Sequence, residues 1–144
     1  MTENTADSCR NPLFTLSGNV IHGNHLGVQL GFPTANLDIV FGQELTGKLG
    51  VYAVLVHWND KLYPGIANIG YKPTLKERSF SVEVHLIEFS GNLYGEKLSI
   101  DFCEKIRNEI KFSSLQQLAE QMERDQEKAK EILSRFFQAD TNPA

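Results

Sequence analysis

Residues 50–69 read GVYAVLVHWNDKLYPGIANI, which is two β-rich runs joined by Asn59-Asp60. Asn and Asp tolerate the left-handed backbone that a two-residue hairpin loop requires. We therefore predict an antiparallel hairpin between Gly50–Trp58 and Lys61–Ile69. Similar short runs, bounded by Gly, Pro, Asn or Asp, occur at Phe14–Ile21, Ser79–Phe89 and Lys97–Phe102.

The period of the apolar residues changes after Lys111. Ser113 with Gln116, or Ser114 with Gln117, fits a capping box at the start of a helix. Apolar residues then recur at helical spacing in two groups: Leu115, Leu118, Ala119 and Met122, and further on Ala129, Ile132, Leu133, Phe136 and Phe137. Because the polar segment between them places Asp125 where it can cap a second helical piece, we expect a kink or break there.

Strands that precede helices favour an α+β fold that is mainly β. Five or six short strands leave open edges unless the sheet closes, so we expect a small antiparallel barrel with C-terminal helices. A length of 144 residues suits one domain. We place this domain at residues 13–138, between polar flexible tails at 1–12 and 139–144.

Charge, the length of apolar stretches and cysteine spacing limit the classes of function that we expect. Fourteen basic and 18 acidic residues give a net charge of −4 without a basic cluster, so we do not expect nucleic-acid binding. No stretch approaches the roughly 18 apolar residues of a membrane span, and the first ten or so residues lack a signal-peptide core, so we expect a cytoplasmic protein. Cys9 and Cys103 lack metal-type spacing and are expected to be free thiols.

A glycine-bearing segment precedes the sequence Gly31-Phe32-Pro33-Thr34-Ala35-Asn36. Glycines permit close approach of backbone to phosphates, and Thr34 and Asn36 offer the hard oxygen ligands that Mg²⁺ prefers. The segment lacks the Gly-Lys-Ser/Thr of a Walker loop, however, and short motifs of this kind are more often turns. The pattern alone leaves both interpretations open.

The run Ser81–Leu86 alternates between an apolar and a polar face, with Glu83 and His85 on the polar one. For an antiparallel strand the simpler interpretation is that this face meets water. In the functional interpretation, Glu83 lies at the mouth of the barrel as the general base for an alcohol, an effect worth about 10²- to 10⁴-fold. A lone histidine such as His85 more often packs or forms a hydrogen bond than catalyses.

The segment Ile106–Phe112 leads into the expected helix. Its arginine and its aromatic residue could hold a planar ring and the ring's polar edge. Such linkers more commonly anchor a helix by packing and surface charge. The sequence pattern does not choose between these two roles.

In combination these segments resemble the riboflavin kinase family, in particular the kinase module at the C-terminal end of bacterial bifunctional FAD synthetases. The resemblance covers roughly residues 14–137, and its most specific part is the Pro-Thr-Ala-Asn box followed downstream by Glu-Val-His. The matching segments are Gly18–Gly23, Leu30–Asn36, Gly50–Ala53, Gly65–Gly70, Pro73-Thr74, Val82–Leu86, Leu93–Gly95, Ile106–Glu109, Phe112 and Asp125.

The resemblance implies a six-stranded Greek-key barrel that transfers the γ-phosphate of ATP to the 5′-hydroxyl of riboflavin, giving FMN and ADP, with Mg²⁺ as cofactor. Glu83 matches the catalytic base, and Thr34 and Asn36 match the positions that contact Mg²⁺. The residues that match the family's ATP-binding positions are Gly23, His25, Gly27, Gly31, Pro33, Thr34, Asn36, Leu86 and Tyr94. The residues that match the family's flavin-binding positions are Arg107, Ile110 and Phe112. We expect a monomer that, without an adenylyltransferase module, stops at FMN.

One departure from the family concerns the ATP side, where Val28 and Gln29 stand in place of the usual Arg or Lys and predict weaker ATP binding. The alternative function is a catalytically weak or inactive sensor of the same fold that binds flavin or nucleotide. A third interpretation is a β-barrel interaction module. Intact Thr34, Asn36 and Glu83 argue for the kinase, whose mechanism requires that these three residues converge on one pocket.

Overall fold

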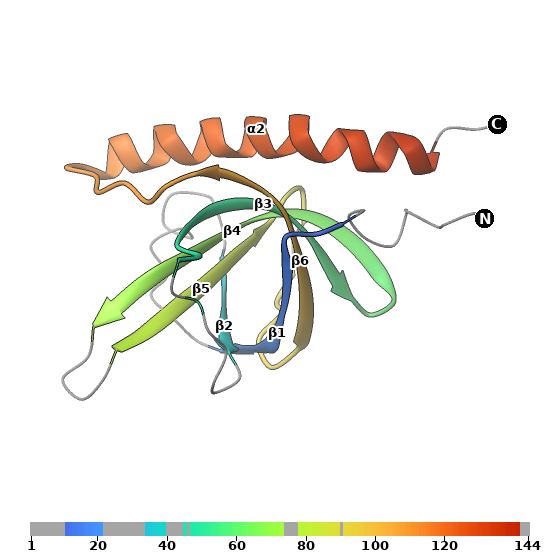
Figure 1. Ribbon diagram of the computed structural model, residues 1–144, viewed down its shortest axis with the longest axis horizontal. Coiled ribbons are helices and arrows are strands. Elements are labelled where there is room, and N and C mark those ends of the chain that lie inside the picture. Colours follow the sequence, from blue (N-terminus) through green and yellow to red (C-terminus); the bar gives the residue numbers. More distant parts are fainter. Residues whose placement is uncertain are drawn as a thin grey trace.

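A closed antiparallel barrel with one helix across its wall forms the body of the protein (Figure 1). The computed structural model describes residues 11–21, 34–39, 45, 47–73, 78–89 and 91–141. Within them the barrel order is β1-β2-β5-β4-β3-β6, and the prediction of a six-stranded, mainly β fold is confirmed. The elements are β1 (Phe14–Ile21), β2 (Ala35–Ile39), β3 (Gly50–Trp58), β4 (Lys61–Pro73), β5 (Arg78–Leu86), β6 (Lys97–Arg107) and α2 (Leu115–Thr141).

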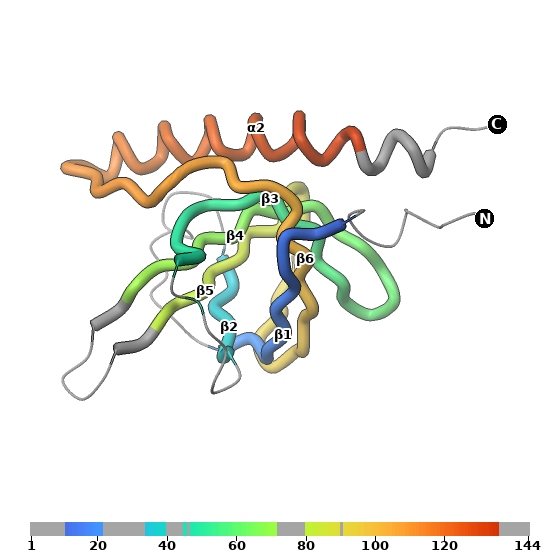
Figure 2. Tube along the Cα trace, in the orientation of Figure 1, coloured from blue at the N-terminus to red at the C-terminus, as the bar shows by residue number. Residues whose placement is uncertain are grey.

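The hairpin of β3 and β4 forms as its sequence predicts, with pairs from Gly50↔Ile69 to Trp58↔Lys61. Asn59 and Asp60 have φ angles of 56° and 62°, the positive values that a tight hairpin loop needs for its twist to match that of the strands. Strand β4 continues beyond the predicted end, and its pairing with β5 reaches Pro73↔Arg78. The two strands therefore run on together past the barrel body (Figure 2).

The barrel interior is filled by alternate residues of all six strands. Phe102 is fully buried, and its ring stacks on that of Phe14 at 4.5 Å between centroids. Each aliphatic or aromatic side chain buried in this way contributes roughly 1.5–3 kcal/mol. Because the interior takes every second residue, the residues between them point to the outer wall. Interior members include Leu16, Val20, Leu37, Val54, Val56, Ala67, Ile69, Val82, Val84, Leu98 and Ile100.

Helix α2 packs on the outer wall over β3, β4 and β6 and closes a second apolar cluster of Ala53, Leu55, Ile87, Ala129, Ile132 and Leu133. The predicted break at Asp125 is wrong, because α2 is continuous from Leu115 to Thr141. Asp125 is only 4% exposed and both of its carboxylate oxygens accept hydrogen bonds from Arg107, so it pairs with the barrel instead of capping a second helix. Residues 139–141, which we expected in a tail, are helical.

The helix begins at one of the two capping sites that the sequence offers. The Ser114 hydroxyl accepts a hydrogen bond from the Gln117 N–H at 3.1 Å, and the Gln117 side chain turns back to the Ser113 N–H at 3.2 Å. The first bond satisfies one of the N–H groups that a helix start leaves without partners, and the second ties the residue before the cap to the first turn.

Replacing Ser114 by Ala is expected to lower the free energy of unfolding by about 1 kcal/mol, because the Gln117 N–H loses its acceptor. Urea titration monitored by circular dichroism measures this change. Ser134→Ala is the control, since Ser134 is exposed in the middle of α2 and should change stability by less than about 0.5 kcal/mol. Equal effects of the two substitutions would contradict the capping role.

Two further findings concern the cysteines and the membrane. Cys103 is disulfide-bonded, so the prediction of a free thiol is wrong at this position. The sequence spacing could not reveal this pairing, which depends on how the chain folds. The other cysteine of the sequence, Cys9, lies outside the described residues.

No helix in the described part of the chain has the length and apolar character needed to span a bilayer.

Candidate active site

A row of directly opposed residues crosses all six strands of the barrel. Strand pairing sets Asn36 opposite Glu83, Glu83 opposite Asn68, and Asn68 opposite Val51. The row ends at Ile21 on β1 and at Arg107 on β6. Opposed residues of antiparallel strands share a face, so the side chains of Asn36, Glu83 and Asn68 lie next to one another.

This face is the outer wall of the barrel, since the neighbours Val82 and Val84 of Glu83, and Ala67 and Ile69 of Asn68, belong to the interior. The expectation that Glu83 lies at the barrel mouth is therefore wrong. Because side chains of β5 alternate between the two faces, the Glu83 carboxylate points away from the barrel interior, toward the linker after β6 and α2.

A cavity of about 230 Å³ lies over this part of the wall. Cavities that enclose a whole drug-sized ligand usually measure roughly 300–1,000 Å³, so this one suits a portion of such a ligand. The strands, the linker after β6 and the first turns of α2 all contribute to it. The lining consists of Thr34, Val51, Ile66, Asn68, Glu83, His85, Arg107, Glu109, Ile110, Phe112, Leu118, Met122 and Asp125.

Two of the three residues predicted for catalysis and for the metal line this cavity. Thr34 and Glu83 both line it, although they are far apart in sequence. Asn36 is not part of the lining, but its backbone is paired directly with that of Glu83. Thr34 and Glu83 therefore share one cavity, Asn36 lies on the neighbouring strand, and the convergence of all three on one pocket stays a prediction.

The residues predicted to bind ATP are distributed differently. Leu86 belongs to the barrel core and Tyr94 is 54% exposed, and neither lines the cavity. The remaining ATP-side predictions, together with Val28 and Gln29, lie outside the described residues: Gly23, His25, Gly27, Gly31 and Pro33. Their roles stay predictions.

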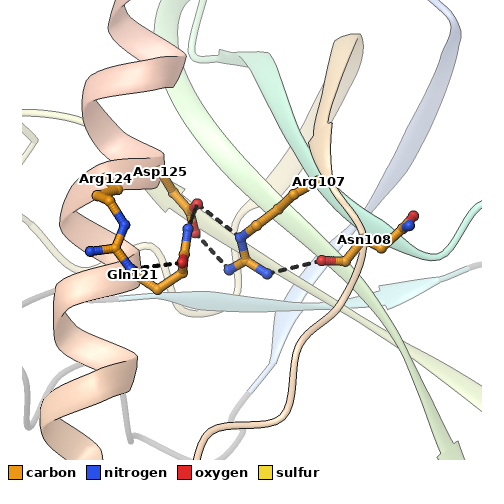
Figure 3. Close-up of polar contacts among 5 residues, drawn as sticks. All are labelled: Arg107, Asn108, Gln121, Arg124 and Asp125. Atoms are coloured by element: carbon orange, nitrogen blue, oxygen red, sulfur yellow. Dashed lines mark hydrogen bonds and ion pairs between the residues drawn. The ribbon is translucent and has the colours of Figure 1, made fainter.

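All three residues predicted for the flavin side, Arg107, Ile110 and Phe112, line the cavity. The Arg107 guanidinium is largely committed to the protein: Nε and Nη2 donate to the two oxygens of Asp125 at 2.9 and 2.7 Å, and Nη1 donates to the Asn108 carbonyl at 3.0 Å (Figure 3). It also lies 5.9 Å from the centre of the Phe112 ring. These contacts favour the anchoring role for Arg107.

The cavity lining also includes residues to which the sequence assigned no role in the site. Asp125 was expected to cap a helix, and Leu118 and Met122 were part of the apolar spacing that predicted the helix. Asn68 lies in the segment Gly65–Gly70 that matches the family, but no role was assigned to it. Its Oδ1 is buried and has no hydrogen-bond partner among the described residues, a deficit that costs about 1–3 kcal/mol.

The residues near Glu83 fit a magnesium ion that is shared with a nucleotide. The described residues contain no group of three His, Cys, Asp or Glu side chains suited to an all-protein metal site. Mg²⁺ usually retains several waters and takes only one or two protein oxygens together with substrate phosphates. The Thr34 hydroxyl and the Asn36 amide oxygen provide such a set. His85, by contrast, is 8% exposed and lies 3.4 Å from the Gln126 side chain, which suits packing against α2.

Comparison with known proteins gives consistent matches. The Flavokinase (riboflavin kinase) family model matches residues 11–133. A bifunctional riboflavin kinase/FMN adenylyltransferase of Haemophilus influenzae is 45% identical over 118 residues, which is 81% of this chain and 38% of that protein.

Two solved structures share the fold. A riboflavin kinase from Trypanosoma brucei gives a TM-score of 0.61 at 28% identity, over 83% of this chain and 79% of that one. A Streptococcus pneumoniae chain described as a macrolide-efflux protein gives a TM-score of 0.74 at 32% identity, over 83% of this chain and 38% of that one.

The chain spans about two fifths of the length of the curated relatives that it matches. The family model nevertheless extends over most of this chain, from before β1 into α2. The Pro-Thr-Ala-Asn box, the Glu83 strand and the Arg107 linker all fall within the matched range. The chain therefore belongs to the riboflavin kinase family.

Proposed function

We propose that this protein transfers the γ-phosphate of ATP to the 5′-hydroxyl of riboflavin, forming FMN and ADP. The observation that carries the proposal is that Glu83 and Thr34 line one cavity, with Asn36 paired opposite Glu83. Family membership supplies the class of reaction, and the cavity that Glu83 shares with Thr34, with Asn36 on the neighbouring strand, supports a carboxylate that acts beside two neutral oxygen donors. That is the arrangement expected for moving a phosphoryl group to an alcohol.

In the proposed mechanism, Glu83 accepts the proton of the 5′-hydroxyl while the hydroxyl oxygen attacks the γ-phosphorus. The bond between that phosphorus and the oxygen bridging to the β-phosphate breaks, and ADP leaves with the electron pair. Glu83 is half-buried in the wall, so its carboxylate is held near the reacting hydroxyl with only partial access to water. A base placed in this way orients the nucleophile as well as accepting its proton.

The Thr34 hydroxyl and the Asn36 amide oxygen would hold Mg²⁺ together with the phosphates of ATP. When bound, the ion supplies positive charge that offsets the charge of the phosphates. In this proposal the two neutral donors hold the ion, and Glu83 acts on the alcohol. The ATP-side positions before Thr34, with Leu86 and Tyr94, complete the nucleotide site in this proposal.

The apolar part of the cavity suits the flavin ring. Ile110 and Phe112 come from the linker, and Leu118 and Met122 come from the first turns of α2. Aromatic and flexible apolar side chains pack well against a flat ring system. Arg107 contributes by holding the linker against Asp125, which keeps Phe112 over the cavity.

The test is incubation of the purified protein with riboflavin and Mg-ATP, followed by chromatographic separation of FMN from riboflavin. Formation of FMN and ADP in equal amounts is the expected result. Binding of riboflavin without turnover would support the sensor alternative instead. Neither binding nor turnover would leave an interaction module as the better description.

A further inference from the structure

Asn68 lies beside the proposed catalytic base in a position that points to a second contact with the substrate. It is in the middle of β4, paired directly with Glu83 on β5, and its side chain lines the same cavity. Its Oδ1 is buried and lacks a hydrogen-bond partner among the described residues. Buried amide oxygens are nearly always satisfied, so an unpaired one on a residue that lines a cavity points to a ligand group that completes it.

The chemistry of Oδ1 limits the kind of ligand group that can pair with it. An amide oxygen only accepts hydrogen bonds, so its partner must be a donor. The neighbouring carboxylates of Glu83 and Glu109 are acceptors when ionised, and each of the three nitrogens of Arg107 already donates one hydrogen bond to Asp125 or to Asn108. An ionised triphosphate offers acceptors only. The ribityl chain of riboflavin, by contrast, offers several hydroxyl donors.

We propose that Asn68 is a positioning and specificity residue that accepts a hydrogen bond from a ribityl hydroxyl next to the one that is phosphorylated. This inference rests on the proposed kinase function. Opposed residues of antiparallel strands hold their Cβ atoms about 4.5–5.5 Å apart, so Asn68 and Glu83 present two acceptors side by side. Two neighbouring hydroxyls of one extended chain match such a pair, which sets the terminal hydroxyl against Glu83.

The test replaces Asn68 by Leu, which has a similar volume and no amide. Riboflavin affinity is measured by quenching of flavin fluorescence in the absence of ATP. We expect the dissociation constant to rise about tenfold, because a ribityl hydroxyl loses its acceptor in a partly buried site. The thermal midpoint of the free protein should not fall, since the substitution removes a buried atom that has no partner. A purely structural role for Asn68 predicts the opposite, a lower midpoint with unchanged affinity.

A substrate analogue identifies the group that Asn68 contacts. A flavin whose ribityl chain is replaced by a 5-hydroxypentyl chain keeps the terminal hydroxyl and lacks the others. The unsubstituted protein should bind this analogue about tenfold more weakly than riboflavin, whereas Asn68→Leu should bind the two nearly equally. Equal discrimination by both proteins would overturn the proposal. The proposal would also be overturned if the unsubstituted protein and Asn68→Leu bound N3-methylriboflavin with equal affinity, because that result would assign the contact to the N–H of the flavin ring.

Asn19→Leu is the matched control, because Asn19 is exposed on the outer wall of β1 and does not line the cavity. It should leave riboflavin affinity unchanged. Failure of this inference is distinguishable from failure of the kinase proposal. Riboflavin binding without FMN formation refutes the kinase alone, and FMN formation with unaltered affinity in Asn68→Leu refutes the role of Asn68 alone. A protein that does not bind riboflavin refutes both.

Discussion

Replacing Glu83 by Gln is expected to lower kcat for FMN formation by about 10²- to 10⁴-fold, the usual contribution of a general base. Glutamine keeps the shape of the side chain but cannot accept the proton of the riboflavin hydroxyl. The Michaelis constants for riboflavin and ATP should change little, because the amide still fills the same space in the cavity. Steady-state kinetics with chromatographic detection of FMN measures all three constants.

Glu109→Gln is the matched control for this experiment. Glu109 is a second carboxylate that lines the cavity, but it lies on the linker after β6 and not in the row with Asn36 and Asn68. Its substitution should lower kcat by less than about tenfold, if the base is specifically at position 83. Activity of Glu83→Gln within a few fold of the unsubstituted protein, or a larger loss in Glu109→Gln, would contradict the assignment.

The second large effect is expected at Asp125. Its side chain is 5% exposed and that of its partner Arg107 is 17% exposed, so both charges are largely removed from water. Replacing Asp125 by Leu leaves the guanidinium without a counter-charge and should lower the free energy of unfolding by about 3–5 kcal/mol. Urea unfolding, followed by the fluorescence of Trp58, measures the change. Flavin affinity should also fall, because the linker that carries Phe112 loses its attachment to α2.

Two controls separate the ion pair from general damage to the helix. The double substitution of Arg107 by Met and Asp125 by Leu should cost less than Asp125→Leu alone, since no uncompensated charge remains. Glu131→Leu breaks the pair with Lys128 on the same helix, where the two side chains are 67% and 53% exposed, and should change stability by less than about 1 kcal/mol. A loss at Asp125 no larger than at Glu131 would refute the role proposed for the pair.

The parts of the fold that followed from the sequence are those with local causes. The hairpin of β3 and β4 could be predicted because Asn59 and Asp60 tolerate the positive φ angles of its loop. The start of α2 could be predicted because Ser114 caps an N–H only three residues away. The apolar pattern of the sequence did not predict strand β2, because this strand has only five residues and Leu37 alone among them is buried. Its strand conformation depends on pairing with β1 and β5.

The mistaken break in α2 has a similar explanation. From the sequence, Asp125 lies in a polar interval between two apolar groups, which is typical of a cap. In the structure it is a buried residue of a continuous helix, paired with an arginine that the sequence places before the helix. A buried ion pair between distant segments has no periodic signal. The pairing of Cys103 escaped prediction for the same reason.

The sequence by itself determined the strand-rich class, the hairpin, the helix start and the side of β5 on which Glu83 lies, because alternation and turn chemistry act over a few residues. Only the tertiary structure decided that this outward face is partly covered by the linker and α2. It also decided that Thr34 lines the same cavity as Glu83, and that Asn36 and Asn68 lie opposite Glu83 on the two neighbouring strands. These strands are paired across long stretches of chain, and their pairing depends on closing the barrel as a whole.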